Sequence, residues 1–161
     1  EDEWHNFTKS DEYKEMPEGF VEVSEMDHLL YGAAYYPEYF RTKNPRTDMR
    51  LLKDARFNLI RVAESTWSTW EPREGEFDFS LLREVLEAAR EYDISVIIGT
   101  PTYAVPPWLA RKYPDILAET HQGKQRYGNR QIFDLTHPGY RFHAERIIRR
   151  LLEAARRRPL P

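Results

Sequence analysis

Cysteine is absent from the 161 residues of this chain. Its absence excludes disulfide scaffolds, cysteine nucleophiles and thiolate metal sites within these residues. Long hydrophobic runs are absent too, since no stretch approaches the roughly 18 uncharged apolar residues that a membrane span needs. The first residues also lack the basic, apolar and small-residue pattern of a signal peptide. We therefore expect no membrane association and a cytoplasmic location.

Excess positive charge is missing as well. The net charge is -3, from 24 basic and 27 acidic residues, so the overall electrostatics give no case for nucleic-acid binding. The charge is uneven, however: residues 1–28 hold ten acidic and two basic side chains, and residues 141–161 hold seven arginines and two glutamates. We interpret residues 1–28 as an acidic leader that lies on the surface or is partly disordered. The basic end keeps a helical apolar period, which indicates a solvated outer helix face.

Strand and helix patterns alternate through the middle of the chain. Three short apolar runs are typical of parallel strands covered on both faces, and they span residues 29–34, 58–62 and 94–99. Each run precedes a segment with helical spacing of its apolar residues, at residues 46–56, 79–92 and 138–157. Three consecutive strand–helix units build a parallel sheet, which is either open and doubly wound or part of a barrel.

Two observations favour the barrel. The first run is not followed by the glycine-rich phosphate loop that a dinucleotide-binding fold usually needs. Polar residues instead follow the strands, with Glu38 after the first, Glu64 after the second and Thr100 after the third. (β/α)8 barrels place their chemistry at this end of the strands. The predicted fold class is therefore α/β, a partial TIM (β/α)8 barrel of about three N-terminal βα units with parallel strands.

The length of the chain conflicts with a complete barrel, which needs about 250 residues. Three parallel strands alone leave two sheet edges and one face without partners. We expect residues 29–161 to be the N-terminal portion of a larger barrel, truncated before its fourth strand. The alternative is that the chain pairs with itself or with another chain to cover that surface.

Seven segments carry a resemblance to a known family. They are residues 31–38 (YGAAYYPE), 58–64 (NLIRVAE), 67–79 (WSTWEPREGEFDF), 99–102 (GTPT), 106–109 (PPWL), 113–117 (YPDIL) and 126–130 (RYGNR). In this order they resemble glycoside hydrolase family 42, the bacterial β-galactosidases, over about residues 30–157. The W-x-x-x-E-P-x-x-G pattern alone also occurs in related barrel glycosidases, so by itself it indicates the clan.

The resemblance implies a retaining glycoside hydrolase that releases terminal β-D-galactose from a β-galactoside or another small oligosaccharide, without a cofactor. It also implies a homo-oligomeric parent enzyme, commonly a trimer. In the family the acid/base glutamate follows the fourth strand and the nucleophile lies further on, so both are expected beyond Pro161 and the isolated chain is expected to be inactive. Two alternatives remain open, a non-catalytic sugar-binding or scaffolding module and another clan-related barrel glycosidase.

Two arginines are the leading candidates for contact with substrate or nucleophile. Arg61 resembles the clan's arginine that steadies the nucleophile, because a neighbouring guanidinium favours the charged form of a carboxyl. Its structural alternative is an ion pair with Glu64 or Glu71. Arg130 matches the family's galactose-binding arginine, and a guanidinium there would donate parallel hydrogen bonds to sugar hydroxyls. The alternative for Arg130 is an ordinary surface position.

Supporting roles are predicted for Glu64, Tyr36 and Glu38, which surround the expected barrel mouth. Glu38 and Glu64 follow adjacent strands, so they are also a possible catalytic pair, although the family pattern argues against it. Trp67 is the best candidate for stacking on a sugar face, with packing of a loop onto the barrel as its alternative. Glu71 precedes Pro72 and is expected to fix its loop.

Three positions depart from the family pattern. Arg56 and Asp93 stand where members often have glycine in a left-handed helix C-cap, and arginine tolerates that conformation poorly, so the first helix is expected to end differently. Asp134 stands near the place of a cysteine that binds a structural metal in many members, so we predict no metal site.

His137 precedes Pro138, which indicates a role at the entry of the last helix.

Overall fold

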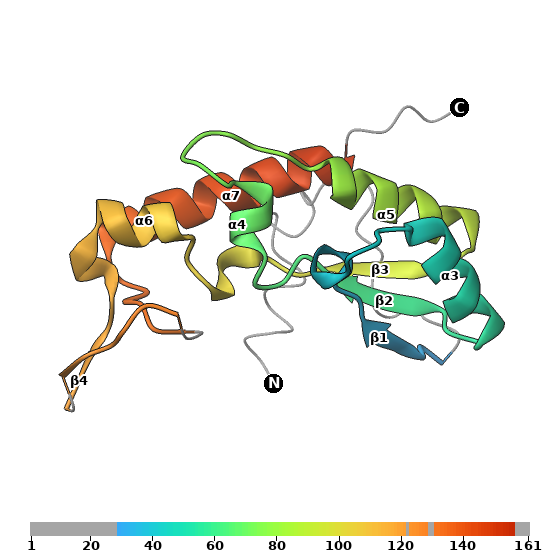
Figure 1. Ribbon diagram of the computed structural model, residues 1–161, viewed down its shortest axis with the longest axis horizontal. Coiled ribbons are helices and arrows are strands. Elements are labelled where there is room, and N and C mark those ends of the chain that lie inside the picture. Colours follow the sequence, from blue (N-terminus) through green and yellow to red (C-terminus); the bar gives the residue numbers. More distant parts are fainter. Residues whose placement is uncertain (1–28, 122, 129–130, 157–161) are drawn as a thin grey trace, which may run out of the picture.

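The computed structural model describes residues 29–121, 123–128 and 131–156 (Figure 1). The expectation for the acidic leader at residues 1–28 therefore lies outside the described residues. Three parallel strands form the main sheet in the order β1-β2-β3, as predicted; they are β1 (Gly32–Ala34), β2 (Leu59–Val62) and β3 (Ser95–Ile98). A second sheet, the hairpin of β4 (Glu119–Thr120) and β5 (Gly123–Lys124), was not predicted.

Helices follow each strand of the main sheet. The longer ones are α3 (Pro45–Asp54), α5 (Ser80–Glu91) and α7 (Pro138–Arg156). Short helices lie between them, namely η2 (Pro37–Tyr39), α4 (Trp67–Trp70), η3 (Pro101–Tyr103), α6 (Pro107–Lys112) and η4 (Pro114–Ile116). Asn44 begins α3 by accepting a hydrogen bond from the Thr47 amide at 3.2 Å, which is the contact of an N-cap asparagine.

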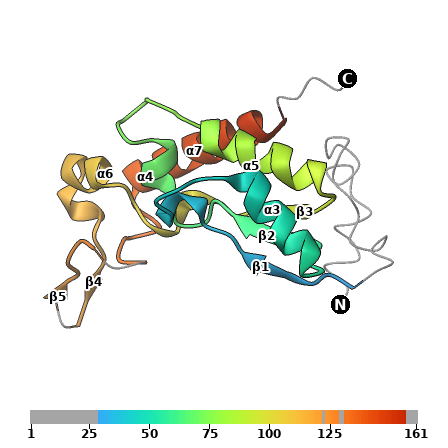
Figure 2. The same cartoon turned by 45° about the vertical axis from the view of Figure 1, so that its right-hand side comes forward.

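The parallel register gives the sheet two unlike faces. Ile60 and Val62 of β2 are buried on the face that α3 and α5 cover (Figure 2). Residues in register on parallel strands point to the same face, so Ala34, Arg61 and Ile97 form a row on the opposite face. All three are exposed, which makes this the face that points into the barrel. The fold is thus a sector of a (β/α)8 barrel.

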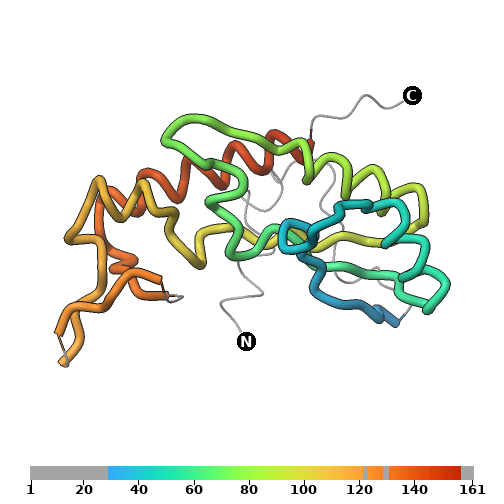
Figure 3. The backbone as a smooth tube through the Cα atoms, in the orientation of Figure 1, coloured from blue at the N-terminus to red at the C-terminus, as the bar shows by residue number. Residues whose placement is uncertain are grey.

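The long helix α7 runs along the molecule and connects the sheet region with the segment around α6 (Figure 3). Its buried stripe includes Tyr140, Ala144, Ile147 and Leu151, in agreement with the helical spacing of apolar residues predicted for residues 138–157. Leu152 is exposed. No helix among the described residues is long and apolar enough to span a membrane.

His137 forms the entry to α7. Its Nδ1 atom accepts hydrogen bonds from the amides of Gly139 at 3.1 Å and Tyr140 at 3.3 Å. These contacts satisfy two of the first helical N–H groups, which have no partner inside the helix. The predicted role of His137 at the helix entry is confirmed.

Arg56 and Asp93 both take the left-handed conformation, with φ of 67° and 51°. After α3 the amide of Arg56 donates to the Lys53 carbonyl at 2.9 Å, and the Phe57 amide donates to the Leu52 carbonyl at 2.9 Å. After α5 the Asp93 and Ile94 amides make the equivalent contacts. The expectation that α3 ends differently is therefore wrong: the closing hydrogen bonds force the same turn on arginine.

We expect the substitution Arg56→Gly to stabilise the chain by about 1 kcal/mol, because glycine adopts a positive φ without the steric cost that arginine carries. Urea unfolding followed by circular dichroism measures the change. Arg50→Gly, inside α3, is the control and should destabilise by a similar amount. An unchanged or lower midpoint for Arg56→Gly would show that the turn carries no strain.

Candidate functional site

The carboxyl ends of β1 and β2 bring Tyr36, Arg61 and Glu64 together. The Tyr36 hydroxyl donates a hydrogen bond to Glu64 Oε2 at 3.1 Å. Arg61 Nη2 lies 2.6 Å from the same carboxylate oxygen. Of the two ion-pair partners considered for Arg61, Glu64 and Glu71, the one in contact with it is therefore Glu64. The Arg61 side chain is 48% exposed and the Glu64 side chain 31% exposed, so this cluster faces open space at the barrel mouth.

Glu38 lies in η2, just after β1, and within the described part of the chain it forms no hydrogen bond or ion pair with that cluster. Its Oε1 atom is buried and has no hydrogen-bond partner among the described residues. Burial raises the pKa of Glu38, while its own backbone amide and the charge of Lys43 act in the opposite direction. One oxygen of the Glu38 carboxyl thus lacks a partner among the described residues, and the supporting role of Glu38 stays a prediction.

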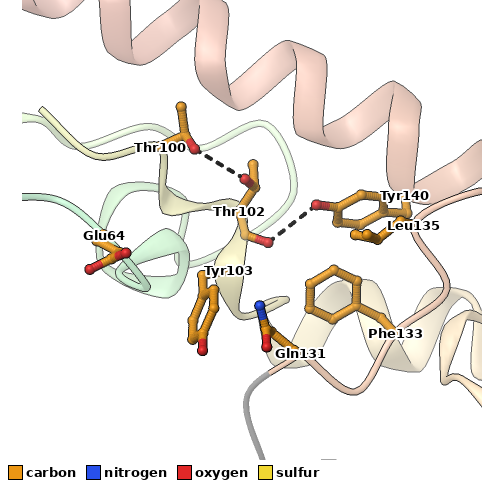
Figure 4. Close-up of a pocket in the computed structure, with 8 residues that line it drawn as sticks. All are labelled: Glu64, Thr100, Thr102, Tyr103, Gln131, Phe133, Leu135 and Tyr140. Carbon is orange, nitrogen blue, oxygen red and sulfur yellow. Dashed lines mark hydrogen bonds between the residues drawn. The ribbon is translucent and has the colours of Figure 1, made fainter.

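A cavity of about 310 Å³ opens beside Glu64 (Figure 4). Polar groups and aromatic rings share its wall, which consists of Glu64, Thr100, Thr102, Tyr103, Gln131, Phe133, Leu135 and Tyr140. The Tyr140 hydroxyl donates to the Thr102 carbonyl at 3.3 Å and so fixes the start of α7 against η3. This combination of ring faces and hydrogen-bonding groups suits a ligand with both apolar and hydroxyl surfaces, such as a sugar.

The position of Trp67 does not support its predicted role of stacking on a sugar face. Trp67 is fully buried, and its ring packs against Trp108 and Tyr140 with centroid distances of 6.5 and 6.4 Å. Both ring faces are therefore inside the core, and the packing alternative applies. The aromatic side chains that do line the cavity include Tyr103.

Glu71 performs the loop-fixing role expected of it. Its carboxylate is fully buried and accepts from Trp67 Nε1 at 2.9 Å and the Gly75 amide at 2.8 Å. It also forms an ion pair with Arg146 of α7. Because all of these partners are structural, Glu71 ties the loop after α4 to α7.

Arg130 lies outside the described residues, so its galactose-binding role stays a prediction. Its neighbour Gln131 lines the cavity. Four cavity residues from the segment 131–140 were missed as site residues, namely Gln131, Phe133, Leu135 and Tyr140. Their sequence signal was weak, since nothing in the pattern shows that residues 131–140 fold back onto η3.

Asp134, at the position considered for a metal, accepts hydrogen bonds at Oδ1 from the amide and the hydroxyl of Thr136 at 2.8 and 2.6 Å. These contacts lower the pKa of Asp134 and give its carboxylate a turn-forming role. The absence of a metal site stays a prediction.

The parallel strands and the polar cluster at their carboxyl ends are typical of (β/α)8-barrel enzymes. The family model of glycoside hydrolase family 42, described as β-galactosidase, matches residues 34–159. This chain therefore belongs to glycoside hydrolase family 42.

Among curated proteins, the β-galactosidase BgaA of a Thermus species is 33% identical over 125 residues, which cover 77% of this chain and 19% of the relative. The β-galactosidase LacZ of Lactobacillus acidophilus is 29% identical over 81% of this chain and 20% of its own length. The chain thus spans about one fifth of the length of the curated relatives it matches.

Solved structures agree with these relatives. The β-galactosidase of Rahnella sp. R3 superposes with a TM-score of 0.77 at 31% identity, over 84% of this chain and 20% of that enzyme. The β-galactosidase of Halorubrum lacusprofundi gives a TM-score of 0.76 at 30% identity, over 81% and 20%. These matches confirm the prediction of a partial α/β barrel.

Glu71→Ala should destabilise the chain by roughly 3–5 kcal/mol, because it leaves Arg146 partly buried without its partner. Glu74→Ala is the control in the same loop: its ion pair with Lys112 is exposed to solvent, so the loss should stay within about 1 kcal/mol. Thermal unfolding of both variants measures the difference. Equal losses would show that Glu71 does not anchor the loop.

His143 should make the fold sensitive to acid. It is 1% exposed, and burial, assisted by the charges of Arg146 and Lys112, lowers its pKa from the ordinary 6.5 against the opposing effect of Glu74. Below about pH 6.5 His143 binds a proton in the unfolded chain but stays neutral in the folded chain. The free energy of unfolding should therefore fall as the pH falls.

The measurement is urea unfolding between pH 7.5 and 5.0. His143→Phe suits the surrounding rings of Trp108 and Tyr113 and should flatten the loss, whereas His121→Phe, at an exposed turn, should not. A wild-type pH slope retained in His143→Phe would contradict this account.

Proposed function

We propose that this chain is the N-terminal part of the catalytic barrel of a retaining glycoside hydrolase that releases terminal β-D-galactose. The observation that carries the proposal is the contact of Arg61 and Tyr36 with Glu64 at the strand ends, in a family whose curated relatives are named β-galactosidases. The substrate is a β-galactoside or another small oligosaccharide, and the reaction needs no cofactor, because two carboxyl groups perform it.

Arg61 supports the nucleophile in this proposal. A retaining enzyme keeps its two carboxyl groups about 5–5.5 Å apart, and the attacking one must stay ionised. A guanidinium has five N–H donors, and Glu64 is in contact with Nη2 of Arg61. The remaining donors are sufficient for a second carboxylate, whose pKa the positive charge would lower.

Arg130 and the cavity beside Glu64 hold the sugar in this proposal. The cavity offers threonine hydroxyls, the Gln131 amide and the Tyr103 ring, and Arg130 directly precedes Gln131 in the chain. Tyr36 and Glu38 support the first strand end. The trimeric assembly and the cytoplasmic location expected earlier stay predictions.

Neither catalytic glutamate is assigned to these 161 residues. We therefore expect the isolated chain not to hydrolyse a chromogenic β-galactoside, whereas the complete gene product that contains this chain should do so. Inactivity of that complete gene product towards β-galactosides would overturn the proposed function. Turnover by the isolated chain that disappears in Glu38→Gln or Glu64→Gln would instead identify those two residues as the catalytic pair.

Arg130→Ala in the complete gene product should lower kcat/KM roughly 10- to 150-fold, which corresponds to the ~1.5–3 kcal/mol of a charge-assisted hydrogen bond. Arg126→Ala is the matched control, because Arg126 is an exposed arginine four residues earlier, and it should leave kcat/KM unchanged. Steady-state kinetics with a β-galactoside measures both. If the two variants behave alike, Arg130 is not a sugar ligand.

The second candidate is a non-catalytic sugar-binding module. The observation that favours it is the cavity itself, which combines tyrosine and phenylalanine rings with polar groups without needing a catalytic pair. Galactose binding by the isolated chain, measured by calorimetry, together with an inactive complete gene product would support this candidate.

A further inference from the structure

The turn after β2 holds two residues in an unfavourable backbone conformation. Ala63 and Ser65, which flank Glu64, have φ of 71° and 62°. Residues other than glycine, asparagine and aspartate rarely adopt this left-handed region. Left-handed residues usually end helices, as Arg56 and Asp93 do in this fold, but β2 is a strand. The strain at this turn therefore needs another explanation.

The surroundings of the turn enforce the strain. The Tyr35 amide donates to the Arg61 carbonyl at 2.8 Å, and the Gly99 amide donates to the Val62 carbonyl at 2.8 Å. Hydrogen bonds from both neighbouring strands thus fix the chain just before the turn. Ala63 is buried, and its carbonyl accepts from the Thr66 hydroxyl at 2.5 Å. Strain persists at a site only when contacts over-determine it in this way.

Gly99 provides the space for this arrangement. A Cβ atom on residue 99 would lie 2.9 Å from Glu64 Cβ and 3.3 Å from its Cα and amide nitrogen. The first distance is shorter than real Cβ contacts, and two of the three neighbours are backbone atoms. Any side chain at residue 99 would therefore push Glu64 away from β3, which is why glycine follows this strand.

The position of Glu64 decides where the Arg61 guanidinium lies. Glu64 Oε2 contacts both Arg61 Nη2 and the Tyr36 hydroxyl. Arg61 has four side-chain torsions and is half exposed, so without this carboxylate its charged group would be free to move in solvent. An arginine that supports a nucleophile must be held close to the productive geometry.

We propose that Ala63, Ser65 and Gly99 are positioning residues: the strained turn and the missing side chain fix Glu64, and Glu64 in turn directs the Arg61 guanidinium into the barrel mouth. The catalytic consequence rests on the proposed function. The geometric part, that Glu64 directs the Arg61 guanidinium, concerns this chain alone and is tested without an activity assay.

The first test uses nuclear magnetic resonance of the Arg61 guanidinium in the isolated chain. In the wild type its Nη protons should give resolved signals, because the ion pair slows rotation of the group. Gly99→Ala displaces Glu64, and Ser65→Val places a β-branched side chain at a φ of 62°, which such residues rarely adopt, so both variants should lose these signals. Arg56→Gly is the matched control, since it relieves a nearly equal φ of 67° at the opposite end of β2, and it should keep them.

Two outcomes would overturn the geometric part. One is an Arg61 group that rotates freely in the wild type, and the other is resolved Arg61 signals that survive in both Ser65→Val and Gly99→Ala. Ser65→Val keeps the test decisive if Gly99→Ala does not fold, because Ser65 is only partly buried.

The second test uses the complete gene product. Ser65→Val and Gly99→Ala should lower kcat on the order of 10- to 100-fold with a smaller change in KM, and the acidic limb of the pH–rate profile should move to higher pH. The limb moves because a misplaced Arg61 no longer lowers the pKa of the nucleophile. Arg56→Gly should leave the profile unchanged.

A purely structural role would reduce the amount of folded enzyme without moving the acidic limb, and that result would overturn the catalytic part. If the wild-type gene product hydrolyses no β-galactoside, the proposed function fails, and the Arg61 signals still decide the positioning role.

Discussion

The parallel register of β2 with both of its neighbours is the constraint on which the site depends. Arg61 stands opposite Ala34 on one side and Ile97 on the other. This pairing brings the three strand ends to one edge, where Tyr36 reaches Glu64 across β1 and β2. A shift by one residue would turn Arg61 towards the helices and bury its charge without a partner. The packing of Ile60 and Val62 against α3 and α5 therefore also maintains the polar cluster.

Glu64 and Glu71 show how two glutamates seven residues apart take different roles. Glu71 is fully buried and satisfied by Trp67, Gly75 and Arg146, so no contact is left for a ligand. Glu64 is partly exposed and borders a cavity. The number of structural partners that each carboxylate has therefore distinguishes Glu71, which anchors a loop, from Glu64, which borders the site. Residue type and distance along the sequence do not distinguish them.

Sequence patterns predicted the strands and the long helices well, because apolar periodicity reflects which faces are buried. They also placed Arg61, Glu64 and Tyr36 at the same sheet edge, since parallel strands present their carboxyl ends together, but they left the ion-pair partner of Arg61 open between Glu64 and Glu71. They could not decide the role of Trp67, because a tryptophan is equally suited to packing in a core and to stacking on a sugar. Only its contacts with Trp108 and Tyr140 show that it packs in the core. The β4–β5 hairpin and the cavity wall depend on long-range folding that leaves no local period.

Four of the left-handed residues other than glycine lie at the two ends of the main sheet. At the amino ends of β2 and β3, Arg56 and Asp93 close helices with repeated hydrogen bonds, which is a requirement of the fold. At the carboxyl ends, Ala63 and Ser65 close no helix and instead flank Glu64. Barrels place stability at the first edge and chemistry at the second. The same backbone conformation therefore has two causes in this chain, and the edge at which it occurs tells them apart.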